Sequence, residues 1–179
     1  MPTSHPFPAA PWPRSLKVSS ALGTVLLIGV GIASYRAIPV ASGFTHGFGL
    51  TVSLILPALL LGSLFSTVTG YTVSATQLQV RRLLWTSRFP LAGLRHAFPD
   101  PAICHGAIRL IGNAGLYGFT GLYRSKRLGR FHLFATDLRR GVVLVLPDRT
   151  LVVTPAAPEA FLAHLHRFFP ASRAPMPPA

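Results

Sequence analysis

Glycine and basic residues concentrate in one short stretch of the sequence, GNAGLYGFTGLYRSKRLGR at residues 112–130. Glycine recurs at every third position from Gly112 to Gly121, and four cations follow it: Arg124, Lys126, Arg127 and Arg130. Glycine-rich loops can cradle a phosphate with backbone N–H groups, and arginine and lysine side chains bind anions. This stretch is therefore the first candidate for chemistry in the chain.

Two known kinds of phosphate loop do not fit the residues around these glycines. A Walker-type loop needs Gly-Lys-Ser/Thr at the start of a helix, whereas Leu122-Tyr123 after the last glycine is typical of a strand. A dinucleotide loop needs a parallel β-α-β unit, and no crossover helix is indicated. We expect a long excursion between strands, in which the glycines adopt positive φ angles. The sharper alternative is that the four cations contact lipid headgroups, each contributing about 1 kcal/mol near an anionic surface.

No residue pattern predicts a catalytic or metal centre. His164 and His166 would lie about 200° apart around a helix, so they cannot share a metal ion. Cys104 and His105 are adjacent but lack partner ligands, and no serine lies in a nucleophile elbow. The acids are spread over the chain: Asp100, Asp137, Asp148 and Glu159. We therefore predict a protein that is not an enzyme and has no metal or cofactor.

The composition is that of a membrane protein. Half of the 179 residues are hydrophobic and only 12% are charged, against about 25% in soluble domains. No ionised side chain lies between Arg36 and Arg81, yet the net charge is +13. A strongly basic protein needs an anionic partner or surface. Anionic membrane lipid is the first candidate, and nucleic acid is the second.

Two apolar stretches are long enough to cross a membrane. Residues 18–35 are uncharged and would form a helix of roughly 27 Å, close to the hydrocarbon thickness of about 30 Å. Residues 48–68 form a second uncharged stretch, and residues 36–47 between them predict a short external turn. Backbone groups in lipid must satisfy their own hydrogen bonds, so we expect a helical hairpin.

Smaller features of the predicted hairpin concern its packing and its flanks. The small residues Gly23, Gly29, Gly31 and Ala33 predict a close approach of the two helices, and Pro57 predicts a kink or a tight packing point. The proline-rich residues 1–17 and residues 170–179 predict disordered tails at the two ends.

The charges flanking the two stretches predict the orientation. Arg14 and Lys17 precede the first stretch, and a series of arginines follows the second: Arg81, Arg82, Arg88 and Arg95. The positive-inside rule then predicts a multi-pass protein of the cell (inner) membrane with both termini in the cytoplasm. In the alternative, residues 1–35 are a cleaved signal peptide, but their apolar part is longer than usual and a second apolar stretch follows.

Residues 70–169 predict a cytoplasmic domain that is mainly β. Five to seven short strand-like runs precede a helix at residues 155–169 with one apolar face, and VVLVL at 142–146 and TLVVT at 150–154 predict a hairpin. A small β-barrel or sheet capped by a C-terminal amphipathic helix satisfies these elements, because closure removes exposed strand edges.

Several stretches resemble the bacterial pleckstrin-homology-like (PH) domain family. They are YTVSATQLQVRR, the glycine-rich block that runs on to Ala135-Thr136-Asp137, the VVLVLPDRTLVVTP hairpin and the closing PEAFLAHL helix. The resemblance implies a barrel-like sheet with a C-terminal helix, and membrane helices before the domain are frequent in the family. It implies no enzyme activity and supplies no catalytic residues.

The functional hypothesis is a membrane-anchored, non-catalytic PH-like domain that mediates protein–protein or lipid-headgroup contacts at the cytoplasmic face. Homo-oligomerisation is compatible with it, and the protein partner is not identified by the sequence. The alternatives are an accessory subunit of a membrane transporter or envelope enzyme, and, last, a nucleic-acid-binding membrane protein. The candidate contact residues are Arg81, Arg82, Arg124, Lys126, Arg127 and Arg130.

Overall fold

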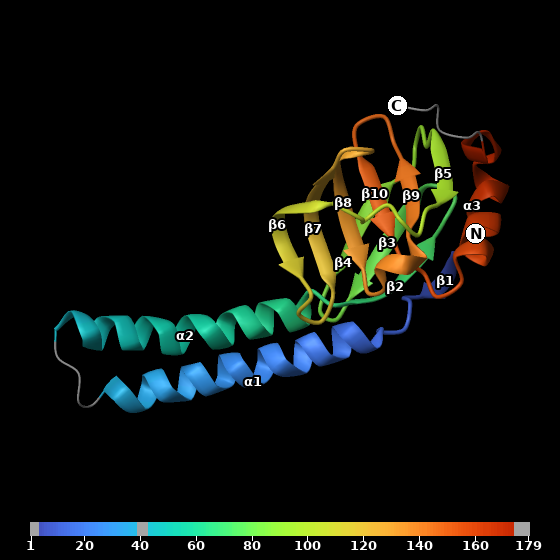
Figure 1. Cartoon of the computed structure of the whole chain (residues 1–179). Coiled ribbons are helices and arrows are strands. Elements are labelled where there is room, and N and C mark those ends of the chain that lie inside the picture. Colours follow the sequence, from blue (N-terminus) through green and yellow to red (C-terminus); the bar gives the residue numbers. More distant parts are fainter. Residues whose placement is uncertain (1–3, 39–42, 174–179) are drawn as a thin grey trace.

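The computed structural model describes residues 4–38 and 43–173. The chain forms a long hairpin of two helices and a β-rich domain at one end of that hairpin (Figure 1). The start of the first helix and the end of the second both lie at the domain, and the two helices project from it in the same direction.

Helix α1 spans Arg14–Ala37 and helix α2 spans Phe44–Phe65. Helix α1 begins earlier than predicted, directly after Pro13, whose fixed φ angle suits the chain entering a helix. Helix α2 ends before the predicted position 68, because Val68 is already the first residue of a strand. The predicted external turn 36–47 is correspondingly shorter, and residues 39–42 lie outside the described residues.

Both helices are long and apolar enough to cross a membrane, judged by length and composition. No residue of α2 is buried, and in α1 burial is confined to a small part of the helix near the domain. Neither helix is therefore the buried core helix of a water-soluble globule.

The helices approach each other differently from the prediction. No atom lies within 4 Å of the position that a Cβ would take on Gly29 or Gly31, so these glycines are not close-contact points. The tight contact is at Gly49, where a Cβ would lie 3.2 Å from Cγ1 of Ile38. Helix α2 continues through Pro57, which lines an apolar crevice of about 370 Å³ between the helices together with Gly31.

A four-stranded antiparallel sheet has the order β1-β2-β3-β4. Its strands are β1 His5–Pro8, β2 Val68–Val73, β3 Gln77–Arg82 and β4 Thr86–Pro90. The predicted disordered tail over residues 1–17 is wrong for its described part, because β1 pairs with β2 and buries Phe7; residues 1–3 lie outside the described residues. Prolines are tolerated in β1 because it is an edge strand, where N–H groups need no partner.

A six-stranded sheet has the order β5-β9-β10-β8-β7-β6. Strands β8 and β10 are parallel, and the other neighbours are antiparallel. The strands are β5 His96–Pro99, β6 Ile108–Ala114, β7 Phe119–Ser125, β8 Gly129–Ala135, β9 Val142–Val145 and β10 Thr150–Val153. The predicted β9–β10 hairpin is confirmed.

The glycine-rich stretch belongs to this sheet and is not a long excursion. Gly112 in β6 lies opposite Gly121 in β7, and only a short tip joins the two strands. The predicted positive φ angles are confirmed at all four glycines of the repeat. A Cβ on Gly112 would lie 2.1 Å from the backbone oxygen of Thr120, so the close approach of the two backbones requires glycine there.

The two sheets remain separate, so the predicted closed barrel is wrong. Strands β4 and β5 follow one another in the chain but belong to different sheets, and β6 ends the larger sheet as a free edge (Figure 1). The predicted C-terminal helix is confirmed as α3 Pro158–Phe168, which buries Phe161, Leu162 and Leu165. Residues 170–173 form a short 3-10 helix where a disordered tail was predicted, and residues 174–179 lie outside the described residues.

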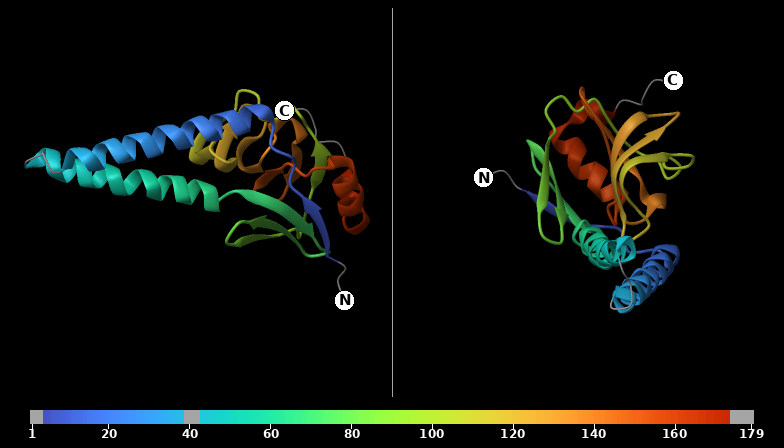
Figure 2. Two further views of the ribbon diagram at one scale, coloured as in Figure 1. Left: turned by 90° about the horizontal axis from the view of Figure 1, so that it is seen from below. Right: turned by 90° about the vertical axis from the view of Figure 1, so that its left-hand side faces the viewer.

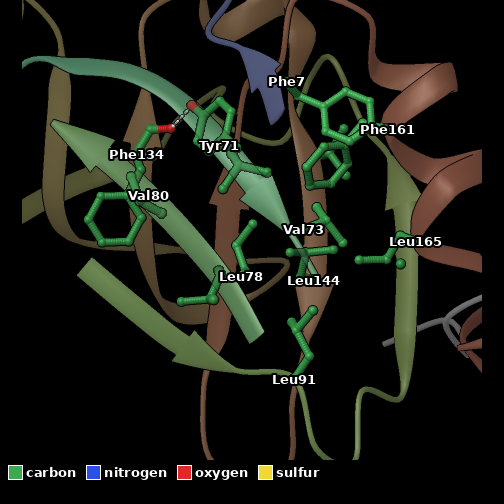
Figure 3. Close-up of a cluster of buried hydrophobic side chains, with 14 of the residues drawn as sticks. Phe7, Tyr71, Val73, Leu78, Val80, Leu91, Phe134, Leu144, Phe161 and Leu165 are labelled. Carbon is green, nitrogen blue, oxygen red and sulfur yellow. Dashed lines mark hydrogen bonds between the residues drawn. The ribbon is translucent and has the colours of Figure 1, made fainter. Parts of the chain in front are cut away.

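The main core lies between the sheets and under α3 (Figure 3). Tyr71 lies within it, and its hydroxyl donates a hydrogen bond of 2.6 Å to the carbonyl oxygen of Phe134 on the other sheet. A second cluster, which includes Ile103, Tyr123 and Phe131, covers the other face of the six-stranded sheet. Burying both faces of this sheet fixes its register, because a one-residue slip would exchange the two faces.

Candidate binding surface

The cations after the glycine repeat gather around the turn that joins β7 to β8. Arg124 lies directly opposite Arg130 in the strand register, an arrangement of like charges that destabilises a sheet unless an anion is near. Lys126 is exposed in the same turn. Arg127 is engaged by Asp100, with 2.9 Å between its guanidinium nitrogen and the carboxylate oxygen. Three of the four cations therefore remain open to an anionic partner.

Arg81 and Arg82 end strand β3 and point to opposite faces. Arg81 is exposed on the outer face. The Arg82 guanidinium lies 5.1 Å from the ring centre of Phe134 and 5.3 Å from that of Trp85, where cation–π attraction holds it. Its Nε is buried without a hydrogen-bond partner, and burial lowers the pKa of this group. Arg82 therefore closes the end of the inter-sheet core and is less accessible to a partner than Arg81.

The six predicted contact residues thus occupy two places rather than one. Arg81 and Arg82 lie at the end of β3 in the four-stranded sheet. The other four lie around the β7–β8 turn of the six-stranded sheet. Sequence spacing alone could not separate these groups, because the sheet to which each strand belongs is a tertiary property.

The tip of the glycine hairpin, residues 115–118, docks on the first turns of α1. The Ser19 hydroxyl donates to the carbonyl oxygen of Gly115 at 2.8 Å, and the Tyr117 backbone N–H donates to Ser20 Oγ at 2.9 Å. The Tyr117 hydroxyl shares a 2.6 Å hydrogen bond with Thr24 Oγ1. These contacts hold the six-stranded sheet against the helix, which gives the glycine block a positioning role.

Leu116 and Tyr117 complete this docking contact. Cδ1 of Leu116 lies 3.0 Å from the position that a Cβ would take on Gly23, so the helix has a glycine where the hairpin presses on it. Tyr117 adopts a φ of 61°, which is uncommon for a residue with a side chain. The packing against α1 therefore maintains a strained backbone at the tip.

The turn between β3 and β4 is apolar and exposed, which the sequence pattern does not predict. Leu83, Leu84 and Trp85 connect β3 to β4, and all three are exposed. The sequence run QLQVRRLLW at residues 77–85 predicts one continuous strand, whereas β3 ends at Arg82. The available signal was the run LLW directly after two arginines, since consecutive apolar residues in a turn are unusual.

The remaining candidates for chemistry are metal-ligating side chains and the thiol of Cys104. Among the described residues, no group of three His, Cys, Asp or Glu side chains could hold a metal ion. Burial, with a contribution from Asp100, raises the pKa of the Cys104 thiol to about 11, so the thiol stays protonated at neutral pH.

Comparison with known proteins identifies a family for the β-rich domain. The sequence model of the bacterial PH domain family matches residues 69–168, which includes every strand from β3 to β10 and helix α3. No curated protein and no solved structure matches the chain. The match covers more than half of the chain and coincides with the two-sheet domain and its closing helix. The chain therefore belongs to the bacterial PH domain family.

Proposed function

We propose that this protein is a membrane-anchored, non-catalytic binding protein. In this proposal α1 and α2 cross the inner membrane as a hairpin, and the PH domain makes protein–protein or lipid-headgroup contacts at the cytoplasmic face. PH domains of this family are generally non-catalytic. In this protein the helical hairpin would hold such a domain at the cytoplasmic face of the membrane.

The observation that carries the proposal is the exposed apolar surface of the two helices. Large apolar side chains are exposed along both, among them Val25, Leu26, Leu54 and Leu59. A continuous apolar surface of this extent is unfavourable in water and favourable in lipid. The β-domain covers only the beginning of α1, so lipid is the natural solvent for the rest.

The pairing of β1 with β2 supports the proposed topology. Strand β1 precedes α1 and β2 follows α2, yet the two strands are hydrogen-bonded neighbours. A hairpin that crosses the membrane twice returns the chain to the side from which it started. Both flanks are basic and are separated by an almost uncharged hairpin, which favours the cytoplasmic side for both.

The topology is tested with reporter fusions on the full chain. A fluorescent protein that folds only in the cytoplasm should be bright at either terminus, and alkaline phosphatase inserted after Gly43 should be active. The membrane fraction should retain the chain after an alkaline carbonate wash. Release by carbonate, or no cytoplasmic signal at either terminus, would refute the proposal.

The crevice between α1 and α2 favours one second candidate, an accessory subunit of a membrane transporter or envelope enzyme. Its walls are apolar and include Gly31, Tyr35 and Pro57, and small residues let another helix approach closely. Purification in mild detergent distinguishes the candidates. A stoichiometric integral-membrane partner that is lost on Gly31→Leu would favour the accessory subunit.

A further inference from the structure

The β3–β4 turn exposes three large apolar side chains in succession. The exposed fractions are 52% for Leu83, 65% for Leu84 and 44% for Trp85. A tight turn at the surface of a soluble domain normally carries Gly, Asn, Asp or Ser. The apolar composition of this turn therefore calls for a partner that is itself apolar.

The strand register fixes where this turn lies relative to the helices. Val68, three residues after the end of α2, pairs with Arg82 at the end of β3. Strand β2 leads away from the helices and β3 returns, so residues 83–85 extend beyond Val68 toward the level of the last turn of α2 at about 3.3 Å per residue. Figure 2 shows the closed end of the β3–β4 hairpin pointing in the direction in which the helices project.

A second apolar row lies on the same side of the domain. Strand β6 is the free edge of the six-stranded sheet and lies on the side from which the helices project (Figure 1). Ile108 and Ile111 on this strand are 68% and 72% exposed. The turn and the β6 edge belong to different sheets, so their common direction is a property of the whole domain.

The turn is held in a defined conformation. The Arg82 backbone N–H donates to the carbonyl oxygen of Trp85 at 2.9 Å, which closes the turn. The Arg82 guanidinium lies against the Trp85 ring and is itself packed on Phe134. Arg82 thus links the indole to the core and presents Leu83 and Leu84 outward.

The charges around the turn complement an anionic surface. Arg81 and Arg88 flank the turn and are exposed, and no acidic residue occurs before Asp100. Tryptophan prefers the boundary between headgroups and hydrocarbon, and arginine near that boundary attracts anionic lipid. The apolar tip of the turn therefore matches the hydrocarbon, the Trp85 ring matches the boundary with the headgroups, and the flanking arginines match the anionic headgroups.

We propose that the β3–β4 turn, assisted by the β6 edge, inserts Leu83, Leu84 and Trp85 into the interface of the bilayer that holds α1 and α2. This inference rests on the proposed membrane anchoring and names the surface that the domain itself contacts. The turn is a third point of attachment besides the helices, and it fixes the tilt of the domain.

Tryptophan fluorescence tests the inference because the chain contains two tryptophans. In Trp12→Phe the emission reports Trp85 alone. The full chain is reconstituted into phosphatidylcholine vesicles with a minor fraction of phosphatidylglycerol, with plain acyl chains or with chains brominated near the carbonyl end. We expect brominated lipid to quench Trp85 and aqueous iodide to leave it bright.

Two further variants provide the controls. Arg167→Trp, combined with Trp12→Phe and Trp85→Phe, puts the reporter on the exposed side of α3, away from the helices (Figure 1), and should respond to iodide only. Leu83→Ser with Leu84→Ser, in the Trp12→Phe chain, should shift Trp85 emission to longer wavelength and make it accessible to iodide. Unchanged lipid quenching in this variant would overturn the role of the leucines.

Vesicle flotation separates failure of the inference from failure of the anchor. If the chains float with the vesicles but Trp85 is quenched by iodide and not by brominated lipid, the turn does not insert and the anchoring stands. If the chains do not float, the anchoring itself is refuted and the inference falls with it.

Discussion

Tyr71 joins the two sheets through its hydroxyl group. The hydroxyl donates to the Phe134 carbonyl at 2.6 Å and accepts the Thr154 backbone N–H at 3.1 Å, and the whole residue is buried. Burial raises its pKa to about 12, so the phenol stays protonated in the folded chain. No sequence pattern marks Tyr71 for this role, because both partners lie more than sixty residues away in the chain.

Tyr71→Phe should lower the free energy of unfolding by about 2 kcal/mol, because it leaves a buried carbonyl and a buried N–H without their partner. Urea denaturation of the detergent-solubilised chain measures the change. The matched control is Tyr123→Phe, whose hydroxyl donates to the partly exposed Asn113 carbonyl that water can reach. An equal loss in both variants would contradict the special role of Tyr71.

His164 on α3 makes the packing of β1 sensitive to acid. Its Nε2 is buried without a partner, and its ring lies 5.0 Å from that of His5 and 5.6 Å from that of Phe7. Burial lowers the pKa of His164, and the charges of His5 and Arg167 lower it further. The folded chain therefore binds fewer protons here than the unfolded chain does.

The stability contributed by neutral His164 should be complete above the ordinary pKa of 6.5 and should be lost as the pH falls through the lowered folded pKa. In thermal unfolding experiments, the melting temperature should fall as the pH is lowered from above 6.5 through the folded pKa of His164. His164→Leu should flatten the dependence, whereas His105→Leu in an exposed loop should retain it. If the melting temperature of His164→Leu depends on pH as strongly as that of the unmodified chain, His164 is not the cause of the pH dependence.

At the scale of elements, the β6–β7 hairpin depends on the contact of two glycines. Gly112 and Gly121 face each other with positive φ angles, and a Cβ on either would lie 2.1 Å from backbone oxygen of the opposite strand. The glycine spacing in the sequence predicted unusual backbone angles. It could not predict two paired strands, because the partner of each glycine is set by the register of the hairpin.

Gly112→Ala should destabilise the domain by at least about 2 kcal/mol, since the strands must separate to admit the methyl group. Gly129→Ala is the matched control, because Gly129 also has a positive φ but no atom within 4 Å of its Cβ position. That variant should cost about 1 kcal/mol from backbone strain alone. Melting temperatures compare the two, and equal shifts would rule out the steric explanation.

At the scale of the whole molecule, the hairpin tip fixes the domain relative to α1. The connections at Ser19, Ser20 and Thr24 lie within the first turns of the helix, next to the Leu116 contact at Gly23. The tip therefore joins β6 and β7, at one end of the six-stranded sheet, to helix α1. Other contacts between the domain and the chain that leads into α1 come from residues before the helix, such as Ala10, whose backbone N–H donates to the carbonyl oxygen of Thr154 at 2.8 Å and whose carbonyl oxygen accepts from the Thr136 hydroxyl.

Gly23→Leu should displace Leu116 and free the tip from α1. Amide hydrogen exchange at residues 115–118 should become faster, while exchange in β10 stays slow because the core is untouched. Gly29→Leu places the same side chain on the same helix where no atom lies within 4 Å, and it should leave the tip protected. Faster exchange in both variants would mean that the effect is not the loss of this contact.

The sequence by itself determined the class of the molecule. The two uncharged stretches predict the helices, because helix length and apolar composition are local properties. The alternating runs and the apolar face of 155–169 predict a β-domain closed by α3, and the quoted motifs predict the family that residues 69–168 match. These features depend on residues close together in the chain, so a linear pattern is enough to reveal them.

Only the tertiary structure decided how these parts meet. It made residues 5–8 a strand, because the edge of β2 supplies hydrogen bonds that no local pattern announces. It kept the sheets open, divided the predicted basic residues between them and brought Leu83, Leu84 and Trp85 to the side of the helices. Strand partners, sheet membership and the direction of a turn are set by contacts between distant residues, and such contacts exist only in the folded chain.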